Sequence, residues 1–107
     1  MISTHILDTS LGTAASGVTV KLLIKNGGQW TTLAAGTTNA DGRFSFDIEK
    51  NVGIYQIIFE IENYFKNKST ECFFQDIPVI FKVENTQRKY HVPLLLNPFG
   101  YSTYRGT

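Results

Sequence analysis

Cysteine is nearly absent from the sequence, because Cys72 is the only one among 107 residues. One thiol cannot close an internal disulfide, and by itself it cannot assemble a zinc site. We therefore interpret Cys72 as a small, partly buried packing residue.

Charge of one sign and long apolar runs are also missing. Ten basic and nine acidic residues leave a net charge of +1 without a basic stripe, which argues against nucleic acid and anionic membranes as partners. No apolar stretch reaches transmembrane length, and the opening MISTHILDTS lacks the basic start and long apolar core of a signal peptide. We expect a soluble, cytoplasmic protein, although a leader removed upstream of Met1 would be compatible with the same sequence.

The sequence does contain enough apolar material for one core. It is 42% hydrophobic and 13% aromatic, which is typical of a globular domain and not of a disordered segment. A chain of this size buries roughly 60–70% of its unfolded surface. No linker, repeat or low-complexity stretch divides it, so we expect a single domain spanning residues 1–107.

Apolar residues recur with a period of two along most of the chain, which predicts strands with one face on the core. The alternating stretches are residues 3–9, 17–25, 29–36, 43–48, 53–62, 76–85, 89–97 and 100–105. Only residues 62–69 have some helical character. We therefore predict an all-β fold, an antiparallel two-sheet β-sandwich of about seven or eight strands with one short helix inside residues 60–70.

The strand at residues 89–97 has an unusual outer face. Its alternation turns Tyr90 and the leucines in phase with it toward the core, and it turns His91, Pro93, Leu95 and Asn97 away from the core. A mixed polar and apolar outer face of this kind is found at contacts between subunits.

Two further residues have both an ordinary and a functional interpretation. His5 lies on the strand face opposite Thr4 and Ile6, and it gains significance only if it shares a pocket with His91, which spacing alone does not establish. Arg43 directly follows an Asn-Ala-Asp-Gly turn. It is either a solvated arginine at a strand end or a fixed clamp for an anion or a carbonyl.

Three motifs, STHILDTSLGTAASGVTVKLL, TTNADGRFSF and YHVPLLLNPFGYSTYRGT, lie at the start, in the middle and at the end of the chain. In these motifs the sequence resembles the transthyretin-like family and, within it, the 5-hydroxyisourate hydrolases of urate breakdown. Those hydrolases end in Tyr-Arg-Gly-Ser, whereas the hormone-carrying transthyretins lack this ending and the accompanying histidines. Here the ending is Tyr104, Arg105, Gly106 and Thr107, and the threonine keeps the hydroxyl while adding one methyl.

The resemblance implies hydrolysis of 5-hydroxyisourate to 2-oxo-4-hydroxy-4-carboxy-5-ureidoimidazoline in purine catabolism. It implies His5, Arg43 and His91 as catalytic residues. It also implies that His5 and Arg43, together with Tyr104 and Thr107, contact the substrate. Which histidine takes the proton from water is left open, and neither a metal nor an organic cofactor is implied.

The resemblance further implies a homotetramer with substrate sites at the interface between two dimers. The competing class is a non-enzymatic, transthyretin-like module that binds a small ligand. Sandwich modules that occur as structural appendages of larger proteins match the first half of this sequence but neither its Tyr-Arg-Gly ending nor its YHVPLLL strand. The hydrolase interpretation is therefore favoured.

Overall fold

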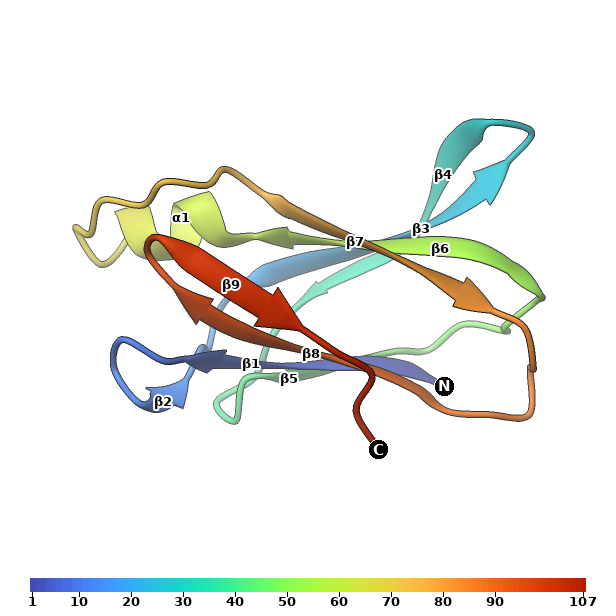
Figure 1. The fold of residues 1–107 in the computed structure, drawn as a ribbon, viewed down its shortest axis with the longest axis horizontal. Helices are drawn as coiled ribbons and strands as arrows, with labels where there is room; N and C mark the ends of the chain where they lie inside the picture. The colour runs from blue at the N-terminus through green and yellow to red at the C-terminus, as the bar shows by residue number, and fades with distance from the viewer.

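Two β-sheets pack face to face, and one short helix lies at an end of the sandwich (Figure 1). The computed structural model describes residues 1–107 throughout. One sheet comprises β1 (Ile2–Asp8), β2 (Thr13–Ala14), β5 (Arg43–Phe46), β8 (Tyr90–Asn97) and β9 (Gly100–Thr103). The other comprises β3 (Thr19–Asn26), β4 (Gln29–Thr37), β6 (Gly53–Glu60) and β7 (Ile77–Val83).

Strand β1 is central to the first sheet. The order there is β2-β1-β8-β9, and β5 pairs with β1 as well. Because β5 pairs with the beginning of β1 and β2 with its end, the two short strands share one edge of β1. The second sheet has the order β4-β3-β6-β7.

The predicted all-β sandwich with one helix is confirmed, and one strand pair departs from the antiparallel arrangement that was expected. Strands β1 and β8 run parallel, from Ile2 beside Tyr90 to Asp8 beside Leu96. Alternation of apolar residues reports which face is buried and carries no information on the direction of the neighbouring strand. The two-residue β2, too short to show alternation, is an additional strand.

The core lies between the sheets and consists of the inward-facing side chains. Alternation predicts one buried face on each strand, and this is confirmed in β6 by Tyr55, Ile57 and Phe59 and in β8 by Val92 and Leu94. Burying a large apolar side chain contributes roughly 1.5–3 kcal/mol, so these faces fix which residues of each strand remain outside. The outward residues of β1, β5 and β8 are therefore available for function.

Helix α1 (Ile61–Lys66) lies inside the predicted segment. It begins at Ile61, a residue that the alternation assigns to the preceding strand. Ile61, Tyr64 and Phe65 are buried, a spacing that puts all three on one helix face. The Tyr64 hydroxyl donates a 2.8 Å hydrogen bond to the buried carboxylate of Asp8, which connects the helix to β1.

No helix of the structure has the length and apolar character needed to span a membrane.

Candidate active site

The candidate site lies on the outer face of three neighbouring strands. On β1, Ser3 and His5 point outward, because Thr4 and Ile6 beside them are buried in the core. Strand β8 pairs with one edge of β1, and β5 pairs with the other. The outward side chains of all three strands therefore form one continuous surface.

The register of these strands brings the predicted catalytic residues together. His5 pairs with Arg43 of β5 on one side and with Pro93 of β8 on the other. Ser3 pairs with His91. His91 therefore lies one outward position away from the row that holds His5 and Arg43. Residues from both ends of the chain and from its middle meet on one face.

A tight turn fixes the backbone of Arg43. The side-chain oxygen of Asn39 accepts hydrogen bonds from the N–H groups of Asp41 and Arg43, at 2.9 and 3.0 Å. Gly42 has a φ of 72°, and its carbonyl accepts the N–H of Ile6 at 2.8 Å. A β-carbon on Gly42 would lie 2.5 Å from the Ile6 carbonyl oxygen, so the turn requires glycine. The Arg43 side chain is exposed, but the backbone that carries it is held in a fixed position by this turn.

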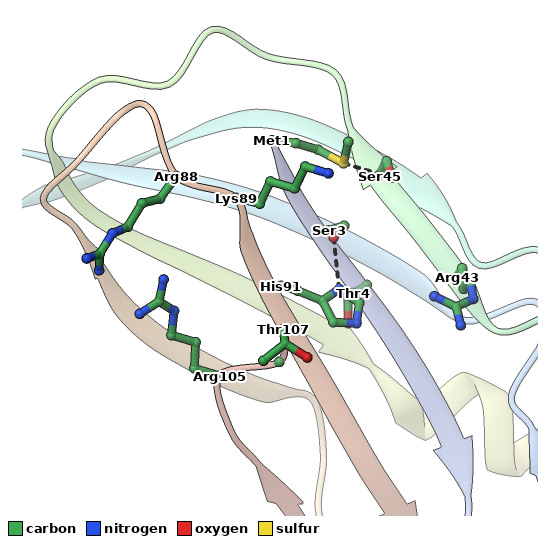
Figure 2. A pocket seen from close by; sticks show the side chains of 11 residues that line it. Met1, Ser3, Thr4, Arg43, Ser45, Arg88, Lys89, His91, Arg105 and Thr107 are labelled. Carbon is green, nitrogen blue, oxygen red and sulfur yellow. Dashed lines mark hydrogen bonds between the residues drawn. The ribbon is translucent and has the colours of Figure 1, made fainter.

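His91 is held by Ser3 and has a shifted pKa. The Ser3 hydroxyl lies 2.8 Å from Nδ1 of His91, the contact drawn as a dashed line in Figure 2. Burial, and then the nearby Arg43 and His5, lower the pKa of His91 below its usual value of 6.5. The neutral form of His91, with one ring nitrogen protonated and the other not, therefore predominates at pH 7.

The C-terminal tail covers His91 and Pro93 from outside. The N–H of Gly106 donates a 2.8 Å hydrogen bond to the carbonyl of His91. A β-carbon at Gly106 would lie 2.5 Å from Cδ2 of His91 and 3.0 Å from Cγ of Pro93, so the close approach depends on glycine. This cover explains why Pro93 is buried although it points away from the core.

Beside the tail lies a hollow of about 690 Å³ (Figure 2), within the usual size range of small-molecule sites. No aspartate or glutamate lines it, whereas several cations and hydroxyls do. Its lining includes Ser3, Arg43, Ser45, Arg88, Lys89, His91, Arg105 and Thr107. The excess of positive charge suits a small polar ligand that carries or develops negative charge.

Two predicted site residues lie beside this hollow and do not line it. His5 neighbours Arg43 in the sheet and contributes to the lowered pKa of His91, but it is not part of the lining. Tyr104 lines a second hollow of about 280 Å³ between β7 and the tail, which it shares with His91. Within one chain, Tyr104 therefore does not join Arg43 and Thr107.

Ser3, Arg88 and Lys89 are among the residues lining the larger hollow that the sequence analysis missed. A signal for Ser3 was present, since it precedes His5 by two positions and must share its strand face. Arg88 and Lys89 directly precede β8, but nothing in the sequence indicates that the tail returns beside them.

No part of the structure groups three His, Cys, Asp or Glu side chains in a way that could hold a metal ion. Cys72 is half-buried, as predicted, and its thiol donates to the carbonyl of Phe74 at 3.4 Å. Burial raises the pKa of this thiol, so it has little thiolate character.

Comparison with known proteins identifies the family. A model of the HIUase/Transthyretin family matches residues 2–106, which include His5, Arg43 and His91. The chain belongs to this family. A family member from Salmonella typhimurium, a 5-hydroxyisourate hydrolase, is 46% identical over 110 residues, which cover 100% of this chain and 81% of that protein.

Solved structures of the HIUase/Transthyretin family include proteins of two kinds. The 5-hydroxyisourate hydrolase of Klebsiella pneumoniae has a TM-score of 0.88 and 37% identity, with 99% of this chain and 98% of that chain covered. Sea bream transthyretin in complex with thyroxine has a TM-score of 0.93 and 31% identity, with 99% and 94% covered. Backbone similarity does not separate the two, so the site residues must decide.

Proposed function

We infer that this chain is a 5-hydroxyisourate hydrolase of urate catabolism. The observation that carries this inference is the pairing of His5 with Arg43 and the adjacent position of His91, beside a hollow lined by cations. The Salmonella relative with this name is similar over the whole chain. The Tyr104-Arg105-Gly106 ending, which the hormone-carrying members lack, supports the same conclusion.

The reaction is the transfer of an acyl group to water. In 5-hydroxyisourate, a carbonyl of the six-membered ring is bonded to a ring nitrogen. Water adds to that carbonyl, and the carbon–nitrogen bond then opens to give the carboxylate of the product. The step needs a base for the water, a stabiliser for the developing oxyanion and a frame for the ring.

Each need has a candidate in the site. The histidines are the candidates for the base, since imidazole is the side chain suited to proton transfer, which typically contributes 10²–10⁴-fold in rate. Arg43 polarises the carbonyl, since a guanidinium on a fixed turn is a suitable donor to an oxyanion. Thr107, at the edge of the hollow, binds the polar edge of the ring.

We further propose a homotetramer with the sites at its dimer–dimer interface. In a single chain the tail covers only His91 and Pro93 on the outer face of β1, β5 and β8, and Phe99 and Tyr104 are 65% and 56% exposed. Tyr104, which does not reach the hollow of its own chain, is proposed to contact substrate across this interface. Light scattering at micromolar concentration should give the mass of four chains, and a monomer would refute the proposal.

We also propose that the protein is cytoplasmic.

The direct test is an activity measurement. Fresh 5-hydroxyisourate is generated from urate with urate oxidase, and its absorbance decay is followed with and without the protein. We expect a strong acceleration that scales with protein concentration. A folded protein that leaves the decay unchanged would refute the hydrolase, and binding of thyroxine by that same protein would favour the alternative ligand-binding module.

A further inference from the structure

Ser3 and His91 face each other across the parallel pairing of β1 and β8. Their side chains approach to 2.8 Å between the hydroxyl oxygen and Nδ1. One residue further along the same two strands, the hydroxyl of Thr4 donates to the carbonyl of Val92 at 2.7 Å. The sheet itself therefore sets the distance between Ser3 and His91, and no flexible loop is involved.

The ring of His91 has little freedom to leave this position. Gly106 lies against the ring so closely that an added β-carbon would be 2.5 Å from Cδ2 and 3.3 Å from Cγ. The Gly106 N–H is bonded to the His91 carbonyl, so the tail is anchored to the residue that it covers. The imidazole is confined between Ser3 and the tail (Figure 2).

The direction of the bond between Ser3 and His91 follows from the available partners. The Ser3 hydroxyl makes one hydrogen bond in the structure, and its partner is Nδ1 of His91. A hydroxyl proton needs an acceptor, and an unprotonated Nδ1 is one. If Ser3 donates to Nδ1, the single ring proton of neutral His91 resides on Nε2.

We propose that Ser3 is a positioning residue that holds neutral His91 with its proton on Nε2, so that His91 donates a hydrogen bond to the substrate oxyanion while His5 is the base. This division of roles rests on the proposed hydrolase function. It answers which histidine takes the proton from water. A neutral imidazole that donates from Nε2 can polarise a carbonyl without transferring its proton.

The proton balance supports this assignment. His5 removes a proton from water as the new carbon–oxygen bond forms, and Arg43 with the Nε2–H of His91 stabilises the resulting oxyanion. When the oxyanion collapses, the carbon–nitrogen bond breaks and the electron pair goes to nitrogen. The protonated His5 then gives its proton to that nitrogen, so the base is restored. His91 keeps its proton throughout and never has to form an imidazolate.

The tautomer can be tested without any substrate. A long-range proton–nitrogen NMR spectrum at neutral pH, with signals assigned by the variant His91→Asn, should show a protonated Nε2 and an unprotonated Nδ1 for His91. A proton on Nδ1 would overturn the proposal whatever the activity of the protein. If Nε2 is protonated but 5-hydroxyisourate is not hydrolysed, the role of Ser3 stands and the proposed function fails.

Variants of Ser3 test the positioning role. Ser3→Ala should lower kcat by about 10-fold with little change in KM, the scale typical for outer partners of functional histidines. Ser3→Thr retains a hydroxyl and should recover most of that loss, together with the Nε2–H signature. Ser102→Ala, a serine of β9 whose hydroxyl makes no hydrogen bond in the structure, is the matched control. Unchanged kcat in a folded Ser3→Ala would overturn the role.

Glutamine variants separate the donor from the base. The amide N–H of glutamine reaches about as far as the Nε2–H of histidine, but an amide cannot act as a base. His91→Gln should therefore keep at least about 10-fold more activity than His5→Gln, since removing a base costs 10²–10⁴-fold. The acid limb of the pH–rate profile should persist in His91→Gln and disappear in His5→Gln. The reverse order of activities would overturn the assignment.

Discussion

Gly106 and His91 are in such close contact that no β-carbon fits between them. Gly106→Ala should push the tail away from the ring and widen the hollow, because the hydrogen bond to the His91 carbonyl cannot persist with the added methyl in place. We expect kcat/KM to fall on the order of 10²-fold, the cost of a displacement of about 1 Å in a site. The thermal melt should shift far less.

The control for this prediction is another glycine. At Gly100, an added β-carbon would meet the side chain of Asn97 at 3.8 Å, an ordinary contact. Gly100→Ala should therefore leave activity near the parent value. Equal activity of the two alanine variants would mean that catalysis does not require the close contact between Gly106 and the His91 ring.

Loss of either central residue should abolish most catalysis. His91→Asn and Arg43→Ala should each lower kcat/KM by at least about 10²-fold, the scale for losing an oxyanion donor. Both variants should remain folded, since Arg43 is exposed and His91 lies outside the core cluster. Lys66→Ala, at the exposed end of α1, is the control and should keep parent activity.

Thr107→Ser restores the ending typical of the hydrolases. It keeps the hydroxyl beside the hollow and removes one methyl from an exposed residue, so we expect activity equal to or modestly above that of the parent. Steady-state kinetics with freshly generated substrate would measure this. A large loss would mean that the methyl is a packing element of the tail.

The lowered pKa of His91 predicts a pH dependence with a definite sign. The unfolded chain binds the His91 proton more readily than the folded one, so this residue contributes stability above its ordinary pKa of 6.5. That contribution is lost as the pH falls through the lower, folded pKa.

An NMR titration would measure this shift directly. The His91 midpoint should lie below 6.5, and Arg43→Gln should move it upward by removing a nearby positive charge. Only part of the shift should return, because burial is the larger cause. Lys66→Gln should leave the midpoint in place. A His91 midpoint that is the same in Arg43→Gln as in the parent would contradict the proximity of His91 and Arg43.

Tyr64 and Asp8 make a separate prediction about stability. Tyr64→Phe removes the donor to Oδ2 of the buried carboxylate, whose other oxygen remains bonded to the backbone of Ser10. Leaving a buried acceptor short of a partner costs about 1–3 kcal/mol, so the denaturant midpoint should fall accordingly. Tyr101→Phe, whose hydroxyl makes no hydrogen bond in the structure, should change it by less than about 0.5 kcal/mol.

Alternation in the sequence was sufficient to predict the strand faces. It placed His5 and His91 outside the core, and both are half-buried on the outer face. It could not predict that β1 and β8 run parallel, since the burial pattern of a strand is the same beside a parallel or an antiparallel neighbour. The contact between Ser3 and His91 depends on that pairing and joins residues 88 positions apart.

The path of the tail was also beyond the sequence pattern. Its motif indicated function, but the burial of Pro93 and the separate location of Tyr104 follow from where the chain turns after β9. Such a turn is fixed by non-local contacts, here the bond from Gly106 to the His91 carbonyl. Amino-acid composition and the period of apolar residues carry no information on contacts between residues that are distant in the sequence.

The parallel pairing of the first strand with the eighth has a consequence for biogenesis. During synthesis β1 emerges first, yet its central neighbour β8 is among the last segments to leave the ribosome. Closing so long a loop is slow, and until it closes one edge of β1 is an unpaired strand edge. A nascent or truncated chain without residues 90–97 thus exposes that edge to other chains. The pairing of β8 with β1 therefore both assembles the candidate site and removes the strand edge that could aggregate.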